Sequence, residues 1–176
     1  MRYPVLLGVL ALGAGLGAVP AAAQVPFDTN RNQGIGVTLG AASGSGLSYT
    51  EILPSAYGFR GVLALWKYGD FSFVDVGASG LRILSDDGRR RLYLVASTSY
   101  WRREDEKTED EFDEEGTLTG TRTFQDVDDS WAAGLGAGVE LPLGARAGLS
   151  LEGVFTYWAD TGDLLPLPQI SLHYLF

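Results

Sequence analysis

Residues 166–176 read PLPQISLHYLF, and from Gln169 onward they alternate between two kinds of side chain. One set is apolar or aromatic and the other is mainly polar: Ile170, Leu172, Tyr174 and Phe176 against Gln169, Ser171, His173 and Leu175. A period of two residues is typical of a β-strand whose two faces meet different surroundings. The stretch therefore predicts a strand that runs to an aromatic end, and such a strand needs partners elsewhere in the chain.

Seven earlier segments have the same character. With the last one, the expected strands are 33–41, 46–53, 58–67, 71–84, 89–101, 130–141, 145–158 and 167–176. Turn-forming residues separate them, as in "PSAYG", "SDDG" and "PLG". No helical spacing of useful length interrupts the series. We predict an all-β fold with eight antiparallel strands in up-and-down order.

The first residues have the composition of an export signal. Arg2 is followed by a continuous run of Val, Leu, Ala and Gly from Val5 to Val19, and Ala21–Ala23 offers small residues for cleavage. The run is too short to span a bilayer comfortably, which disfavours the alternative of a membrane anchor. We expect a signal peptide over 1–23, a periplasmic leader over 24–32 and the barrel over 33–176.

The connections differ in length according to their parity. The even connections are short, whereas the two longest, 102–129 and 159–166, are odd. Transmembrane barrels of outer membranes have short periplasmic turns and longer outer loops. A periplasmic N-terminus places the odd connections outside the cell, and an even number of strands returns Phe176 to the periplasm. The pattern therefore predicts a transmembrane β-barrel in a bacterial outer membrane.

The tryptophans fit this topology. All four fall toward the end that it places outside: Trp66, Trp101, Trp131 and Trp158. Aromatic side chains favour the boundary between membrane and water, so we expect them to form an aromatic girdle. The alternative is that they pack the core of a soluble protein.

The predicted strands have one apolar face and one face of small, polar or charged residues. The second face carries three cations and three anions: Arg60, Arg91 and Arg146 with Asp75, Glu140 and Glu152. An eight-stranded barrel is only wide enough for side chains to fill it, and charges inside must pair because an unpaired buried charge is costly. We predict a lumen plugged by ion pairs. A soluble lipocalin-like barrel would show the reverse pattern.

The export signal, the eight alternating segments, the short even turns and the final "HYLF" resemble the small eight-stranded outer-membrane proteins of Gram-negative bacteria, of the OmpA/OmpX type. The resemblance covers the architecture of residues 33–176 and no subfamily motif. It implies that Tyr174 and Phe176 belong to a signal for the barrel assembly machinery. It also implies outer-membrane lipid and lipopolysaccharide as surroundings.

The segment between strands five and six is strongly acidic. Nine carboxylates and one Lys lie between Glu104 and Glu115. Blocks of like charge stay solvated, so we expect 102–129 to be a long extracellular loop, with 117–124 able to extend the neighbouring strands as a hairpin. Loose binding of divalent cations is the functional alternative, with candidate ligands Glu109, Asp110, Glu111, Asp113, Glu114 and Glu115. Binding of a basic partner is another.

Little in the sequence points to catalysis. Some barrels of this size modify lipid A with His, Ser and an acidic residue, and the corresponding set here would be His173, Ser171 and Glu152. His173 lies at the periplasmic end, whereas those enzymes act on the outer leaflet, so a hydrogen-bonded interior histidine is the simpler interpretation. The chain lacks cysteine and has a net charge of −9, which disfavours thiolate metal sites and nucleic-acid binding.

We therefore expect a non-enzymatic outer-membrane protein, without a cofactor, in a structural or surface-interaction role. A narrow channel or carrier for small solutes is the main alternative, since inward glycines leave room for one. A lipid A-modifying enzyme is the third and least favoured.

Overall fold

The computed structural model describes residues 32–69, 71–112 and 118–176, and in them the chain forms a closed antiparallel barrel. The strands are β1 (Gln33–Leu39), β2 (Gly46–Ile52), β3 (Tyr57–Tyr68), β4 (Phe71–Asp86), β5 (Arg91–Phe112), β6 (Leu118–Pro142), β7 (Ala147–Trp158) and β8 (Leu164–Leu175). Each strand pairs with the next, and β8 closes the circle on β1. The all-β, eight-stranded up-and-down barrel predicted from the sequence is confirmed. The residues predicted as a signal peptide, and nearly all of those predicted as a leader, lie outside the described residues.

Across these residues every regular element is a strand, so none offers a helix that could cross a bilayer. We call the end of the barrel that carries the β2–β3, β4–β5 and β6–β7 connections the even end, and the opposite end the odd end. The connections at the even end are tight, as predicted. Gly88 and Gly144 turn the chain there with φ angles of +74° and +80°, which side-chain-bearing residues rarely adopt. The first and last strands also meet at this end, where the Phe176 amide donates to the Gln33 carbonyl at 2.9 Å.

The barrel wall is apolar toward its surroundings, and it directs buried charged and polar side chains, among others, toward its axis. The interior holds Arg60, Glu152 and His173 at 5% exposure or less. The exterior carries a band of large apolar side chains that are 38–70% exposed: Ile35, Val37, Leu39, Leu47, Phe59, Leu63, Val76, Leu92, Leu94, Leu135, Leu151, Phe155, Ile170 and Leu172. A water-soluble barrel has the opposite arrangement, because the hydrophobic effect moves apolar side chains away from water.

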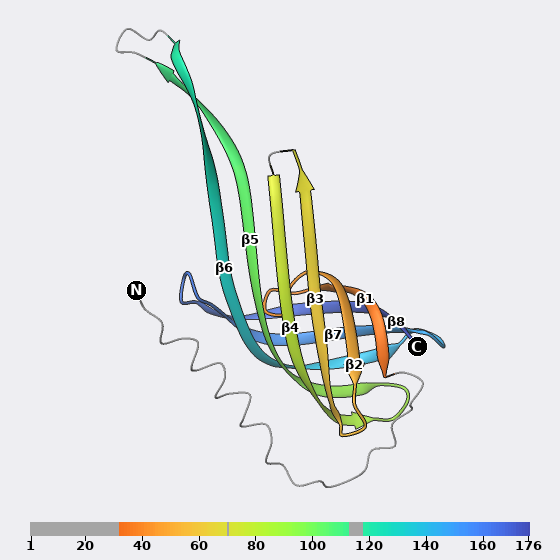
Figure 1. The fold of residues 1–176 in the computed structure, drawn as a ribbon. Coiled ribbons are helices and arrows are strands. Elements are labelled where there is room, and N and C mark those ends of the chain that lie inside the picture. The colour runs from red at the N-terminus through yellow and green to blue at the C-terminus, as the bar shows by residue number, and fades with distance from the viewer. Residues whose placement is uncertain (1–31, 70, 113–117) are drawn as a thin grey trace.

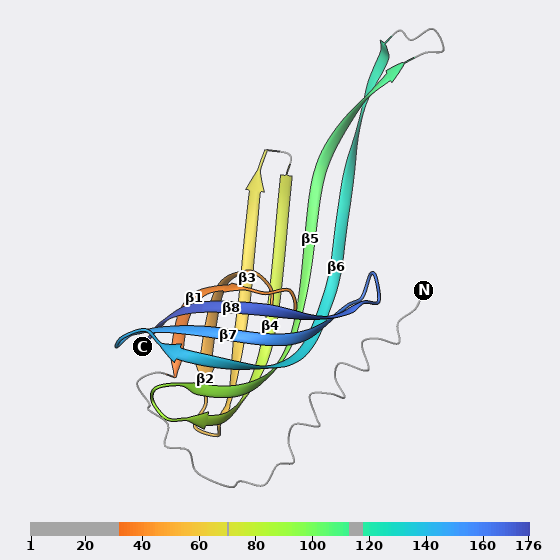
Figure 2. The ribbon, with the colours of Figure 1, turned by 180° about the vertical axis from the view of Figure 1, so that it is seen from behind.

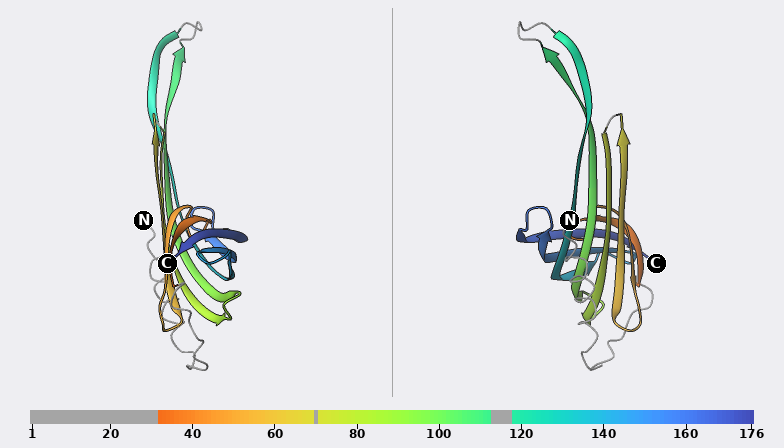
Figure 3. Two further views of the ribbon diagram at one scale, coloured as in Figure 1. Left: turned by 90° about the vertical axis from the view of Figure 1, so that its right-hand side faces the viewer. Right: turned by 60° about the vertical axis from the view of Figure 1, so that its left-hand side comes forward.

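Strands β3 to β6 continue beyond the barrel at its odd end (Figures 1 and 2). Pairing of β2 with β3 stops at Leu47 and Leu63, and pairing of β6 with β7 begins at Ala132 and Trp158. Beyond these last pairs with β2 and β7, the described residues of β3 to β6 pair only with one another. We call this part the projecting sheet: residues 64–68, 71–75, 101–112 and 118–130. Figure 3 shows it as a narrow layer beside the barrel, with the β5–β6 hairpin reaching farthest.

The prediction of a long loop over 102–129 is wrong for most of that segment. β5 continues to Phe112 and β6 starts at Leu118, in register from Arg102 paired with Asp129 to Glu111 paired with Gly120. The hairpin extension expected for 117–124 therefore exists and is longer than predicted. A two-stranded ribbon with water on both faces needs no alternation of apolar and polar residues. The charged sequence of this segment therefore gave no sign of its strands.

Candidate functional site

A buried ion pair crosses the middle of the barrel. Arg60 of β3 donates from Nη1 to Oε1 of Glu152 on β7 at 2.6 Å, and both side chains are 1% exposed. The Tyr93 hydroxyl donates to the same carboxylate oxygen at 2.7 Å, and Arg60 Nε donates to Thr50 Oγ1 at 3.3 Å. These bonds join β2, β3, β5 and β7 across the axis. Arg60 and Glu152 were both predicted to face the lumen in an ion-pair network, and there they pair with each other. Tyr93 is a third member that the sequence did not reveal.

A second ionic group closes the even end. Arg91 donates to Asp86 Oδ2 at 2.8 Å and to Glu140 Oε1 at 3.1 Å. A cavity of about 20 Å³ beside these three residues has room for about one water molecule. The predicted residues Arg91 and Glu140 are together, and Asp86 was missed. A register shift between Ile83 and Ser85 explains this, because it moves Asp86 to the inner face of β4.

Asp75 lies inside, as predicted, but it accepts a hydrogen bond from a loop and does not pair with an arginine. Its Oδ2 accepts from the Ser45 amide at 2.8 Å, and its Oδ1 has no hydrogen-bond partner within the part of the chain that the structure describes. Ser45 belongs to the β1–β2 connection, whose Ala42 and Ser43 are fully buried. The Ser99 hydroxyl holds the same connection by donating to the Ala41 carbonyl at 2.7 Å. This loop fills the odd mouth of the barrel.

The prediction that Arg146 joins the lumen network is wrong. Arg146 lies in the turn between β6 and β7, is exposed, and donates from Nη1 to the Tyr174 hydroxyl at 2.9 Å. Tyr174 is 52% exposed on the outer face. Alternation fixes a face only within a strand, and Arg146 precedes the first residue of β7. Tyr174 and Phe176, which the resemblance connected with assembly, both lie on the outer face at the even end.

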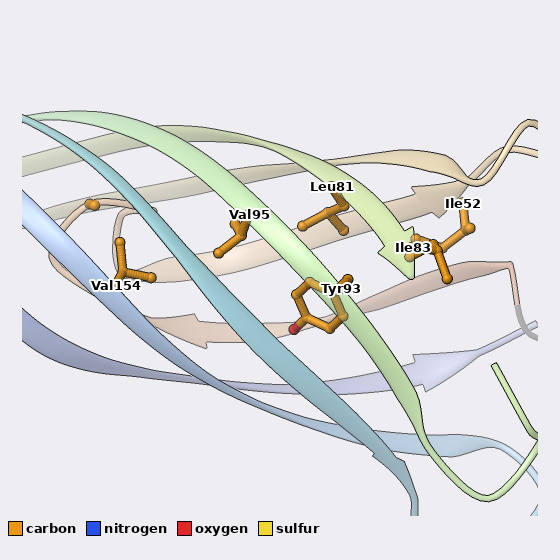
Figure 4. Packing of buried hydrophobic residues seen from close by; sticks show 7 residues of the cluster. Ile52, Leu81, Ile83, Tyr93, Val95 and Val154 are labelled. Atoms are coloured by element: carbon orange, nitrogen blue, oxygen red, sulfur yellow. The ribbon is translucent and has the colours of Figure 1, made fainter. Parts of the chain in front are cut away.

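An apolar cluster also fills the interior, which the sequence analysis had described as small and polar. Figure 4 shows its side chains pointing into the barrel from several strands: Ile52, Leu81, Ile83, Tyr93, Val95 and Val154. Ala42 of the β1–β2 loop completes the cluster. The lumen is thus closed by apolar packing as well as by ion pairs.

His173 is 1% exposed and belongs to the interior hydrogen-bond network. Its Nε2 lies 3.1 Å from Ser48 Oγ and 3.3 Å from Thr50 Oγ1. Ser171 instead accepts at its Oγ from Thr38 at 2.9 Å, and Glu152 is bound to Arg60. The three residues weighed as a triad therefore bond to other groups, in the manner of interior packing.

The four tryptophans lie at the odd end but do not share a face. Trp131 is on the outer face, 54% exposed, with its ring 5.0 Å from that of Tyr100. The other three lie on the inner face. Trp101 pairs in register with the inward Asp75. Trp66 and Trp158 lie an even number of residues from the buried Val62 and Thr156 of their own strands. A girdle requires the outer face, so only Trp131 fits the girdle predicted for all four.

The projecting sheet carries its own exposed ion pairs, including Arg102 with Glu104 and Arg103 with Asp105. Of the candidate ligands for divalent cations, Glu109, Asp110 and Glu111 lie in β5, and Asp113, Glu114 and Glu115 lie outside the described residues. Among the side chains that the structure describes, no group of three or more His, Cys, Asp or Glu is arranged to hold a metal ion.

The sequence matches no protein-family model and no curated protein.

Proposed function

We propose that this protein is a non-enzymatic outer-membrane β-barrel that anchors a surface-exposed sheet for interaction outside the cell. The observation that carries the proposal is the reversed polarity of the barrel wall. Its outer face is a continuous apolar band, and its inner face contains the Arg60–Glu152 pair. A closed barrel satisfies all of its backbone hydrogen bonds internally, as a hydrocarbon environment requires.

The few charged or polar groups on the outer face support this orientation. Glu51 lies toward the even end, where its carboxylate accepts from the Tyr49 hydroxyl at 2.9 Å and from the Gln33 side chain at 3.3 Å. Arg82, also near that end, packs its guanidinium 4.3 Å from the centre of the Tyr57 ring. Long or hydrogen-bonded polar groups near a membrane boundary can reach water. We infer that the even end faces the periplasm and the projecting sheet faces outward.

The filled lumen favours an anchor over a channel. The lumen holds the Arg91 group at the even end, the Arg60–Glu152 pair in its middle and the β1–β2 loop at the odd end. The apolar cluster packs alongside all three, from Ile52 near the even end to Ala42 of the loop. A conducting path would require several of these to move together. We expect refolded protein in a planar bilayer to show no steady single-channel current, and regular current steps would favour the narrow channel instead.

The membrane location is tested by gel mobility and protease access. A folded barrel in the outer-membrane fraction should migrate differently in SDS before and after boiling. Protease added to intact cells should cut within the β5–β6 hairpin and give two fragments, one with β1–β5 and one with β6–β8, which stay together until the barrel is unfolded. Recovery in the soluble periplasm, or an absent heat shift, would contradict the proposal.

The proposed partners follow from this location. Outer-membrane lipid and lipopolysaccharide would surround the apolar band, and the barrel assembly machinery would insert the chain. Loose binding of divalent cations by the acidic tip remains a proposal that calorimetry with Ca²⁺ can test. For a lipid-modifying activity, lipid A mass spectra of cells with and without the protein are the corresponding test, and we expect them to be the same.

A further inference from the structure

The inner face of the projecting sheet gathers the aromatic side chains of that region. By strand register, Trp66 pairs with Phe73 and Tyr68 with Phe71, while Asp75 pairs with Trp101 on the next strand. Phe124 of β6 falls on the same face. We call this set the aromatic face: Trp66, Tyr68, Phe71, Phe73, Trp101 and Phe124.

Two members of this face are open to solvent beyond the barrel mouth, and the other four are half-buried. Trp66 is 66% exposed and Tyr68 is 79% exposed, which is unusual for large aromatic side chains that continue the interior side of a barrel. The β3–β4 and β5–β6 hairpins stand clear of the barrel in Figures 1 and 3. Rigid, exposed Trp and Tyr side chains supply large contact area at low entropic cost, and they dominate the energy of many interfaces.

Carboxylates border the aromatic face on β6. Asp128 pairs in register with Arg103, and Asp126 pairs with Asp105. Arg103 itself lies over the Phe71 ring, with its guanidinium carbon 5.4 Å from the ring centre. Arg103 also pairs with the Asp105 carboxylate of its own strand. The sheet's own arginine thus shows how a guanidinium can contact this surface, stacked on an aromatic ring and paired with a carboxylate.

The net charge of the projecting sheet favours a positively charged partner. Residues 102–129 contain twelve acidic and four basic residues, a net charge of −8 out of −9 for the whole chain. Below the aromatic face, Asp75 is 6% exposed, and one of its oxygens has no hydrogen-bond partner among the described residues. A strongly negative sheet attracts cations over distances near the Debye length, and aromatic rings bind cations through their faces.

We propose that the aromatic face is the docking site for an arginine- or lysine-rich peptide segment. Its cationic side chains would stack on Trp66 and Phe73 and pair with Asp128, while the acidic hairpin increases the rate of encounter. This inference rests on the proposed surface role of the sheet and names the chemistry of the partner.

Fluorescence anisotropy of labelled peptides with full-length protein refolded in detergent micelles tests the proposal. The probes are a short peptide that alternates Arg and Gly and a matched peptide that alternates Glu and Gly. We expect the Arg peptide to bind, with an affinity that falls as salt is added, and the Glu peptide not to bind. Equal binding of the two peptides would overturn the proposal.

Neighbouring residues on the same strands provide matched controls. Trp66→Ala should weaken binding about five-fold, whereas Leu65→Ala, on the opposite face of β3, should not. Asp128→Asn should weaken binding about three-fold, whereas Asp129→Asn, on the opposite face of β6, should not. Equal losses within either pair would show that the face has no specific role and would overturn the proposal.

Two further readouts separate the ways in which the proposal can fail. The heat-dependent gel shift of each sample shows whether its barrel is folded. A variant that keeps the shift but loses binding is therefore folded, and its loss of binding is due to the substituted surface residue. Protease access in cells tests the membrane location independently of peptide binding. Failure of the Arg peptide to bind, together with binding of a labelled lipopolysaccharide polysaccharide, would overturn the peptide proposal in favour of a glycan.

Discussion

The barrel wall and the projecting sheet are made from the same strands, but the wall keeps its outer face apolar, whereas the sheet has both apolar and charged residues on each face. In the wall, β3 directs Arg60 inward and Leu63 outward. Farther along the same strand, Trp66 occupies the inner face, and the neighbouring outer face of β5 carries the Arg102–Glu104 ion pair. Side chains point to the two faces in turn in both regions, so the backbone does not cause the difference. Residue choice therefore follows what lies on each side of the sheet.

The largest effect is expected from the buried ion pair. Glu152→Leu removes the partner of Arg60 and an acceptor of Tyr93, and an unpaired buried charge should lower the free energy of unfolding by about 3–5 kcal/mol. Urea unfolding in micelles measures this. Arg60→Met combined with Glu152→Leu should recover much of the loss.

The matched change in the projecting sheet is Glu104→Gln, which breaks an exposed pair with Arg102. Surface pairs are worth about 0–1 kcal/mol, so this variant should unfold almost like the wild type. Similar losses for Glu104→Gln and Glu152→Leu would remove the distinction between the two regions.

The next largest difference is expected in the stability cost of a positive charge introduced on the outer face of the barrel wall and of the projecting sheet. Leu135 and Val127 both lie on the outer face of β6, at 45% and 44% exposure, but only Leu135 is in the barrel wall. Leu135→Arg in a lipid bilayer should cost about 2–4 kcal/mol, because lipid cannot solvate the charge.

Val127→Arg serves as the control and should change stability by less than about 0.5 kcal/mol, because an exposed position in water tolerates charge. Reversible unfolding in lipid vesicles measures both variants. An equally small effect of the two substitutions would place the wall in water.

A smaller effect is expected where the β1–β2 loop enters the barrel. A Cβ on Gly77 would lie 1.9 Å from the Ser43 carbonyl oxygen, whereas a Cβ on Gly80 would meet no atom of the described residues within 4 Å. Gly77→Ala should cost about 1–3 kcal/mol through overpacking or displacement of the loop. Gly80→Ala should be close to neutral. Urea unfolding compares the two, and a neutral Gly77→Ala would show that the loop is not packed as described.

The smallest effect concerns the β4–β5 turn at the even end. The Asp87 carboxylate accepts from the amides of Arg89 and Arg90 at 2.9 Å each, and these bonds lower its pKa from the usual 3.8. A lowered folded-state pKa stabilises the fold above pH 3.8, and that contribution is lost as pH falls through the lowered value.

Asp87→Asn should therefore differ slightly from the wild type at neutral pH, and the difference should vanish in acid. Urea midpoints over a pH series measure it. A gap that widens toward low pH would contradict the assignment of these bonds to the ionised carboxylate.

The sequence predicted the fold well because a barrel wall imposes a period of two on every strand that crosses it. It predicted for the same reason that Arg60, Glu152, Arg91 and Glu140 face the lumen and take part in ion pairs, but alternation does not say which of them pair with each other. Asp86 was missed because a register shift changes its face, and Arg146 was misplaced because it lies in a turn. The projecting strands were missed because water on both sides removes the period.

The face of the tryptophans was predicted incorrectly for a different reason. Their position along the strands suggested a girdle, but parity with the buried Val62 and Asp75 already places Trp66 and Trp101 on the inner side. Counting alternate residues from a buried position through the rim would have located the aromatic face. Its openness could not be predicted, because that depends on where β2 and β7 stop pairing with the longer strands.

The most direct test of the account is cysteine labelling along the outer face of β6, which the absence of native cysteine makes clean. Val127→Cys and Leu135→Cys are prepared separately in lipid nanodiscs and treated with a membrane-impermeant maleimide. The account predicts rapid labelling at position 127 and protection at position 135, with the protection lost after unfolding in urea and detergent. Equal labelling of both positions in the folded protein would contradict it.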